Sequence, residues 1–135
     1  MDLTEAIAIA GSGMQVQSAR LTVIAENLAN QETTGATPGS DPYRRKTISF
    51  ADVLDPTMGV DLVRVKQVGE DESAFPLRYD PTNPAANAAG YVKAPNVNTF
   101  IEMTDMRDAE QSYSANLQVL SVSRSMLTRV IGMLK

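Results

Sequence analysis

Apolar residues recur every three or four positions in two long stretches, one at each end of the chain. The recurring positions of the first stretch are Leu3, Ile7, Ala10, Met14, Gln17, Leu21, Ile24 and Leu28. Those of the second stretch are Met103, Met106, Glu110, Tyr113, Leu117, Leu120, Arg124, Leu127, Ile131 and Leu134. This spacing places side chains on one face of an α-helix and is typical of helices that pack as coiled coils. The pattern predicts two long helices, over about residues 3–30 and 100–134.

Polar residues mark where each predicted helix begins. Asp2 and Glu5 have the spacing of a capping pair, and Asp2 also lies at the positive end of the helix dipole. Thr99 and Glu102 form a capping box directly before the second apolar stretch. We therefore expect the first helix to begin near residue 3 and the second near residue 100.

Two glycines weaken the first predicted helix and three polar residues interrupt the stripes, and each set leaves two interpretations open. Gly11 and Gly13 each cost roughly 1 kcal/mol relative to alanine inside a helix. Either a neighbouring backbone approaches closely there, or packing holds the helix despite its weak propensity. Gln17, Glu110 and Arg124 bring polar groups into the stripes. Because polar seam residues fix register and partner, these three are either specificity positions or residues at the margin of a face that drifts.

The residues between the two stretches have no helical period. Residues 31–41 are rich in Thr, Gly and Pro and predict a loop, whereas residues 42–50 and 60–68 predict two strands. This segment is too polar to give either helix a deep core, so the helices must pack on each other, on copies of themselves or on other chains. We expect a mainly α fold in which two long terminal helices pack as a coiled-coil-like pair around a small central insert rich in strands and loops. The expected division is an N-terminal helix at 1–30, the insert at 31–98 and a C-terminal helix at 99–135.

Composition excludes much enzyme chemistry. The chain has no histidine and no cysteine, so it lacks the commonest general base and the commonest metal ligands. Its acidic residues do not form a calcium-loop motif, and its net charge of −4 argues against binding nucleic acid. We predict no catalytic, cofactor-binding or metal-binding residue and expect proteins as partners.

The chain also lacks the sequence features of membrane insertion. No apolar run approaches the roughly 18 to 20 residues that span a bilayer. The N-terminus carries Asp2 and Glu5 where a secretory signal carries basic residues. We therefore expect no direct membrane insertion, and either a cytosolic location or export by a route that reads no cleaved signal.

Short motifs resemble the flagellar rod and hook family of axial proteins. Asn27-Leu28-Ala29-Asn30, which closes the first predicted helix, resembles the Asn-Leu-Ala-Asn signature of that family. The block Gly90-Tyr91-Val92-Lys93-x-Pro95-Asn96-Val97 is more specific and resembles a proximal rod subunit of the flagellar basal body. Gln31 departs from the small residue that usually follows the first motif, and no tyrosine follows Gly35, which leaves the path of residues 31–41 open.

The resemblance implies a non-enzymatic structural subunit of the proximal rod in the flagellar basal body. Proteins of this family are exported through the flagellar type III apparatus without a cleaved signal. They assemble helically, with copies of themselves and other rod proteins, into the hollow drive shaft that transmits torque across the periplasm. The terminal helices form the inner wall of that shaft. The apolar positions implied for the assembly interface are Leu3, Ile7, Met14, Leu21, Ile24, Leu28, Met103, Met106, Tyr113, Leu117, Leu120, Leu127, Ile131 and Leu134.

Two other functions compete with this interpretation. A soluble homodimeric coiled-coil adaptor or export chaperone in the cytosol would show the same two apolar stripes. It would form a stable dimer without entering a filament. A small carboxylate-dependent hydrolase would need a defined cleft, and nothing in the sequence calls for one.

Overall fold

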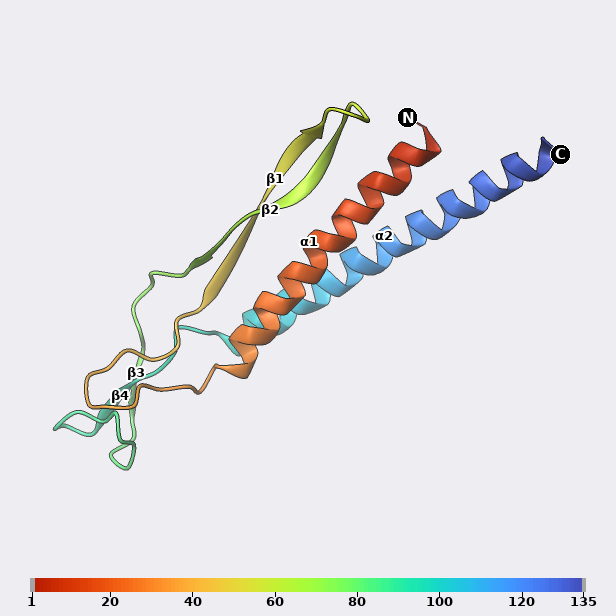
Figure 1. Cartoon of the computed structure of the whole chain (residues 1–135). Helices are drawn as coiled ribbons and strands as arrows, with labels where there is room; N and C mark the ends of the chain where they lie inside the picture. Colours follow the sequence, from red (N-terminus) through yellow and green to blue (C-terminus); the bar gives the residue numbers. More distant parts are fainter. Residues whose placement is uncertain (1, 135) are drawn as a thin grey trace. The chain divides into compact units, whose positions relative to one another are not determined.

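The computed structural model describes residues 2–134 and is mainly helical, with two long helices and a small antiparallel β region that lies between them in the sequence (Figure 1). The two terminal helices and the small central β region agree with the prediction. The elements in chain order are α1 Leu3–Ala29, β1 Lys46–Asp55, β2 Val60–Glu70, β3 Leu77–Tyr79, β4 Tyr91–Lys93 and α2 Thr99–Met133. Residues 31–41 contain no helix or strand, as expected for a loop. Neither helix in the described range is long and apolar enough to cross a membrane.

The start of α1 agrees with the predicted capping pair. The backbone amide of Asp2 donates to Oε2 of Glu5 at 2.7 Å, and Oδ1 of Asp2 accepts from the amide of Leu3 at 2.6 Å. These bonds satisfy donors that the first turn of a helix leaves without partners. The hydroxyl of Thr4 and the amide of Leu3 hold the pKa of Asp2 below its usual range.

The start of α2 corrects the predicted capping box. Asn98, not Thr99, is the cap, because its Oδ1 accepts from the amides of Phe100 at 3.0 Å and Ile101 at 3.3 Å. The hydroxyl of Thr99 instead donates to the side chain of Gln31. Glu102 turns away from the helix end and is fully buried among polar residues of other segments. The predicted capping box does not form because both of its side chains bind residues from other segments of the chain.

The central strands form two separate pairs. β1 and β2 make one two-stranded sheet, and β3 and β4 make another, antiparallel pair in which Arg78 lies opposite Val92. In the turn of the first pair, Oδ1 of Asp55 accepts from the amides of Thr57 and Met58, and Gly59 has a φ of +67°. The strands of the first pair have 10 and 11 residues, whereas those of the second have 3 each, and within residues 2–134 no further strand joins either pair.

The first strand begins later than the sequence predicts and runs further. The amide of Tyr43 donates to the carbonyl of Thr33 at 3.0 Å, and the amide of Arg45 donates to Oδ1 of Asn96 at 2.8 Å. These bonds occupy the backbone that was expected to start the strand at residue 42. The strand therefore begins only at Lys46.

The chain forms two compact units, and each helix contributes to both. The first unit holds the chain up to Leu21, Ile48–Gln67, and the chain from Met106 onward. The second holds Thr22–Thr47 and Val68–Asp105. The first unit therefore contains most of the β1–β2 hairpin, and the second contains the β3–β4 pair and the loops.

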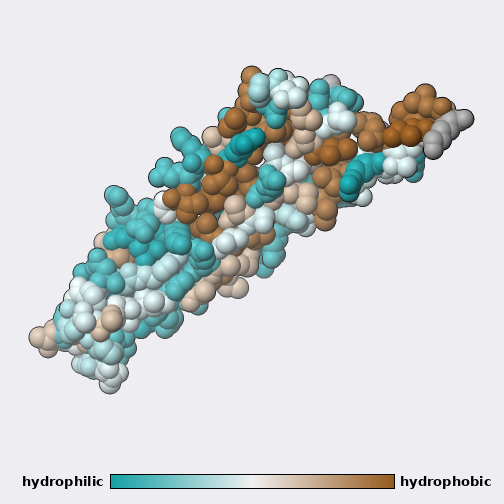
Figure 2. Space-filling view, in the orientation of Figure 1, coloured by the Kyte–Doolittle hydropathy of each residue, from teal (hydrophilic) through white to brown (hydrophobic). Residues whose placement is uncertain are grey.

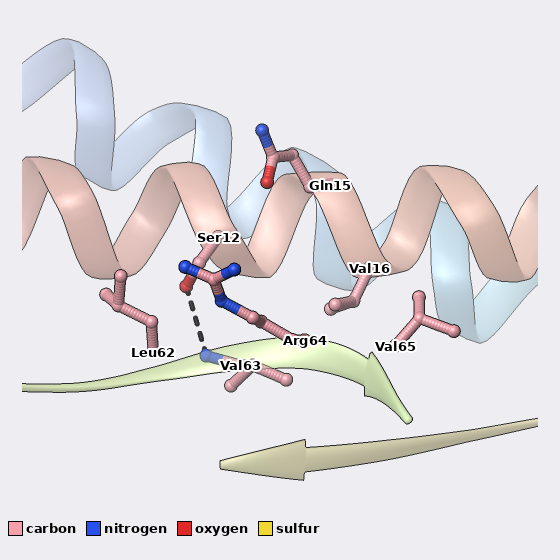
Figure 3. Close-up of a pocket in the computed structure, with 7 residues that line it drawn as sticks. All are labelled: Ser12, Gln15, Val16, Leu62, Val63, Arg64 and Val65. Atoms are coloured by element: carbon pink, nitrogen blue, oxygen red, sulfur yellow. Dashed lines mark hydrogen bonds between the residues drawn. The ribbon is translucent and has the colours of Figure 1, made fainter. Parts of the chain in front are cut away.

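Within the first unit, α1 contacts both the hairpin and α2. The amide of Val63 in β2 donates to the hydroxyl of Ser12 at 3.3 Å, beside a recess of about 290 Å³ that is also lined by Val16 (Figure 3). Where α1 contacts α2, a Cβ atom added to Gly13 would lie 2.7 Å from Nδ2 of Asn116. Gly13 is thus the glycine at a close approach, whereas Gly11 has open space around it.

Candidate assembly interface

The buried face of α2 differs from the predicted stripe. At half of its positions the buried residue is the one directly before the predicted residue. Its buried and half-buried positions include Glu102, Met106, Ala109, Tyr113, Asn116, Leu120, Ser123 and Leu127. They are spaced alternately four and three, so they share one helix face. Met106, Tyr113, Leu120 and Leu127 were predicted. Glu102, Ala109, Asn116 and Ser123 take the places expected for their C-terminal neighbours.

This difference follows from side-chain size. Ala109 is fully buried and Ser123 is 7% exposed, and both are small enough to let another segment approach the helix. A hydropathy pattern favours the largest apolar residues and therefore selects Leu117 over Asn116. The polar residues Glu110 and Arg124 lie on the exposed side, at the margin of the buried face.

The predicted interface residues consequently differ in exposure. Ile24 is buried in α1, and five others in α1 are half-buried: Leu3, Ile7, Met14, Leu21 and Leu28. The exposed members are Met103, Leu117 and Ile131 in α2 and Leu134 directly after it. Figure 2 shows hydrophobic residues gathered along the first unit and toward the C-terminal end of α2. A surface of this kind is typical of a protein that binds other chains.

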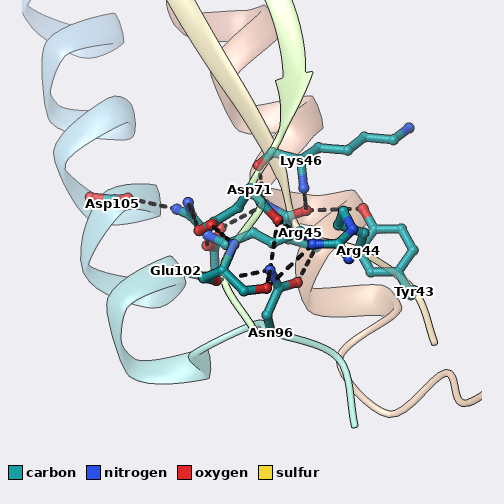
Figure 4. Close-up of polar contacts among 10 residues, drawn as sticks. Tyr43, Arg44, Arg45, Lys46, Asp71, Asn96, Glu102 and Asp105 are labelled. Atoms are coloured by element: carbon teal, nitrogen blue, oxygen red, sulfur yellow. Dashed lines mark hydrogen bonds and ion pairs between the residues drawn. The ribbon is translucent and has the colours of Figure 1, made fainter. Parts of the chain in front are cut away.

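The second unit holds a buried polar cluster around Asn27, the first residue of the Asn-Leu-Ala-Asn motif. Figure 4 shows other members of this cluster, among them Tyr43, Arg45, Asn96 and Glu102. Its Nδ2 donates to the carbonyl of Lys46 at 2.9 Å and to Oε2 of Glu102 at 3.1 Å. Its Oδ1 accepts from the hydroxyl of Tyr43 at 2.9 Å and from the amide of Lys46 at 2.8 Å. All four hydrogen bonds that a side-chain amide can make are formed, which is why a fully buried asparagine is tolerated here.

Arg45 provides the positive charge of this cluster. Its Nε donates to Oε1 of Glu102, whose side chain is 1% exposed. Its other nitrogens lie 3.5 Å from Oδ2 of Asp71 and 3.9 Å from Oδ2 of Asp105. Burial alone would lower the pKa of Arg45, but the hydrogen bond with Glu102, assisted by the two aspartates, raises it. The buried carboxylate is therefore paired and hydrogen-bonded, as a buried charge requires.

Asn96, from the second motif, joins the loop before α2 to the same cluster. Its Oδ1 accepts from the amide of Arg45, and its Nδ2 donates to the carbonyl of Asp71 at 2.9 Å and to the hydroxyl of Ser73 at 3.0 Å. The amide of Ser73 in turn bonds to Asp71 and holds the pKa of that carboxyl below its usual range. The two motifs thus meet in space although they are distant in sequence.

The remaining motif residues shape the backbone around the β3–β4 pair. Gly90 has a φ of +83°, and a Cβ atom there would lie 2.8 Å from the ring of Tyr79, so only glycine fits. The ring of Tyr91 stands edge-on to that of Tyr79, with centroids 5.3 Å apart. Pro95 is buried, Leu28 is half-buried and Ala29 is exposed. Asn30 donates to the carbonyl of Glu26 at 2.9 Å.

The polar cluster joins several segments of the second unit. Its side chains link the end of α1, the residues before β1, the loop before α2 and the first turn of α2. Between residues 2 and 134, no group of three acidic residues lies close enough to hold a metal ion. The sequence motifs indicated Asn27, Asn96 and Gly90, and the structure places the first two in the polar cluster and gives Gly90 a positive φ. They did not indicate that Arg45 and Glu102 complete the cluster.

Comparison with known proteins identifies the family. Residues 7–37 match the family model described as flagella basal body rod protein, and residues 88–133 match the C-terminal model of the flagellar basal body rod FlgEFG proteins. Flagellar basal-body rod protein FlgC of Agrobacterium fabrum is 53% identical over 133 residues, which cover 98% of this chain and 96% of the relative. The chain belongs to the FlgC family.

More distant FlgC proteins align over nearly the same length. The protein of Salmonella typhimurium is 40% identical over 97% of both chains, and that of Bacillus subtilis is 36% identical over 91% of this chain and 92% of the relative. As a FlgC-family protein, the chain is a structural subunit of the flagellar basal-body rod and not an enzyme. The first family model spans most of α1 and the Asn27 motif, and the second spans the Gly90 block and α2.

Proposed function

We propose that this FlgC-family chain is a subunit of the proximal rod. It assembles helically with copies of itself and with other rod proteins into the hollow shaft that transmits torque across the periplasm. The observation that carries the proposal is the long apolar surface of α2, where Leu117, Ile131 and Leu134 remain about half exposed or more. Burial of apolar surface contributes roughly 25 cal/mol per Å², so such a surface favours association.

The proposed inner domain consists of residues 1–30 and 99–135, with residues 31–98 as the insert. Its helices pack as a coiled-coil-like pair. Two observations support this packing: the alternating spacing of the buried positions on α2, and the close approach of Gly13 to Asn116. Small residues at such points allow two helices to approach closely, which stiffens the pair.

The proposed interface uses the fourteen apolar positions named above. Those on α1 are mostly half-buried, so they line the margin of the helix pair, and the exposed ones on α2 face neighbouring subunits. A contact between two different patches of identical subunits does not close on itself and generates a helical assembly. This is the symmetry that a shaft requires.

Export through the flagellar type III apparatus, without a cleaved signal, completes the proposal. Membership of the FlgC family supports it, because the family resemblance implies this export route.

The experiment that tests this function is quantitative mass spectrometry of detergent-purified basal bodies from the source cell. We expect tryptic peptides of this chain in a fixed ratio to those of other rod proteins. The cytosolic adaptor instead predicts a stable dimer in the soluble fraction and no peptides in intact basal bodies, an outcome that would overturn the proposal.

A further inference from the structure

The C-terminal half of α2 carries a second exposed apolar row, separate from the predicted stripe. We call it the second α2 face; its residues are Val119, Val122, Met126, Val130 and Met133. Their exposed fractions lie between 43% and 78%, and their spacing of three and four places them on one side of the helix. A shallow groove of about 390 Å³, lined by Val119 and Val122, opens at the N-terminal end of this row.

The charge around the second α2 face is positive. Residues 111–134 contain Arg124 and Arg129 and no acidic residue. Arg129 lies three residues after Met126 and four before Met133, so it borders the second α2 face, whereas Arg124 belongs to the predicted stripe. Arg129 is exposed and forms no ion pair with the residues that the structure describes. A matching partner segment would combine apolar side chains with negative charge.

The tip of the β1–β2 hairpin, residues 51–61, has this composition. It contains three aspartates and no basic residue. Val53 is 43% exposed and Leu54 is 60% exposed, so the tip presents apolar side chains that nothing in its own chain covers. Asp52 and Asp61 are exposed and form no ion pair within residues 2–134.

We propose that the hairpin tip of one copy docks on the second α2 face of another copy of this chain. Leu54 enters the apolar row, and the aspartates of the tip approach Arg129. A protein that carries both halves of such a contact can propagate it from copy to copy, which fits a helical assembly. The inference rests on the proposed rod function and adds which segments meet.

The acidic start of α1 is a less suitable occupant for the second α2 face. Asp2 and Glu5 are already engaged in capping that helix, whereas the aspartates at positions 52 and 61 are unpaired. Charge complementarity therefore favours the hairpin tip.

Photo-crosslinking in assembled basal bodies tests the contact directly. A benzoylphenylalanine placed at Met126 is irradiated in cells whose only copy of the protein carries it, and the purified basal bodies are digested with trypsin. We expect a dimer band in which position 126 is joined to the peptide of residues 47–64, which contains the hairpin tip. The probe placed at Ser121, on the polar side of α2, is the matched control and gives no such product.

The other outcomes separate this inference from the proposed function. A probe chain that enters basal bodies but cross-links to another rod protein or another segment overturns the docking contact and leaves the rod function intact. A chain that carries the Ser121 probe and is absent from basal bodies contradicts the rod function itself.

Charge reversal supplies a second, independent readout. Arg129→Glu places a negative charge opposite the hairpin tip, so we expect at least tenfold less of the chain in basal bodies. Asp61→Arg in the same chain restores the pairing and the yield. The same second change does not rescue Arg124→Glu, which lies on the other side of α2. Equal rescue of both variants, or of neither, would contradict the proposal.

Discussion

Gly13 in α1 faces the side-chain amide of Asn116 in α2, so closely that a Cβ atom on Gly13 would lie 2.7 Å from Nδ2 and 3.1 Å from Cγ of Asn116. Gly11, two residues earlier, has nothing within 4 Å of the same position. Two glycines of equal helix propensity therefore have different structural roles. One allows the helices to approach, and the other only weakens α1.

Substitution of these glycines by alanine should separate the two roles. Gly11→Ala should raise the free energy of unfolding by about 1 kcal/mol, because alanine favours the helix. Gly13→Ala should lack this gain, since its methyl group displaces Asn116. Thermal unfolding followed by circular dichroism measures both. Adding Asn116→Ala to Gly13→Ala should recover the gain; equal stabilisation by the two single changes would contradict the close contact.

The buried amide of Asn27 gives a second prediction. Asn27→Ala leaves the hydroxyl of Tyr43, the amide of Lys46 and part of Glu102 without partners. We expect a loss of about 3 kcal/mol in the free energy of unfolding. Asn30→Ala in the same motif is the matched control and should cost less than about 1 kcal/mol, because Asn30 is only half-buried. Urea denaturation of the unsubstituted chain and of the two variants measures these losses. Similar losses for both variants would refute the special role of Asn27.

The ion pair between Arg45 and Glu102 should show strong coupling. Arg45→Met leaves a buried carboxylate without its cation and should cost about 3 kcal/mol. Glu102→Gln in the same chain removes that charge and should restore most of the loss. Lys46→Met, which breaks the exposed pair with Glu26, should cost less than about 1 kcal/mol. Denaturation of the single and double variants measures the coupling, and additive losses would disprove it.

The depressed pKa of Asp71 predicts a dependence on acid. The amide and hydroxyl of Ser73 hold the folded pKa of this carboxyl below its usual value of 3.8. Its ionised form therefore stabilises the folded state fully above pH 3.8, and this contribution is lost as the pH falls through the folded value. Asp71→Asn should lower the melting temperature at pH 6. The difference from the unsubstituted chain should shrink toward zero at pH 2, and a constant difference would argue against this origin.

Assembly through the exposed part of the predicted stripe gives the last prediction. Leu117→Asp places a charge in a surface that a neighbour is proposed to cover, so the rod should fail to form. Because Leu117 is 47% exposed in the single chain, the helix content of the variant should equal that of the unsubstituted chain. Ser121→Asp, on the polar side of α2, should leave motility normal. Swimming assays and electron microscopy of basal bodies provide the readout; normal motility of the Leu117 variant would exclude this face from the interface.

Much of the fold was predictable because it depends on local patterns. Apolar spacing located α1 and α2, and turn residues located the strands to within a few positions. The Asn98 cap, the late start of β1 and the difference between the buried and predicted faces of α2 were not predictable. Each depends on a tertiary partner: Gln31 for Thr99, Asn96 for Arg45, and α1 for Asn116. A pattern along one segment contains no information about a partner on another.

The candidate site was predictable only in part. The motifs indicated Asn27, Asn96 and Gly90, and hydropathy identified the exposed leucines of α2. The ion pair of Arg45 with Glu102 was not found, because Glu102 has the sequence signature of a helix-capping residue. The second α2 face was visible in the sequence as the spacing of Val119, Val122, Met126, Val130 and Met133. It was missed because the stronger leucine pattern lies beside it.

The hydrogen bond from Asn27 to Glu102 joins positions that are 75 residues apart in the chain. Closing a loop of this length costs entropy that the contact must first offset. The buried amide of Asn27 can bond to Tyr43 and Lys46 earlier, but it lacks its remaining partner, Glu102, until the first turn of α2 has been synthesised. The polar cluster is completed only when three quarters of the chain has left the ribosome, so a nascent chain remains loosely held until late in translation.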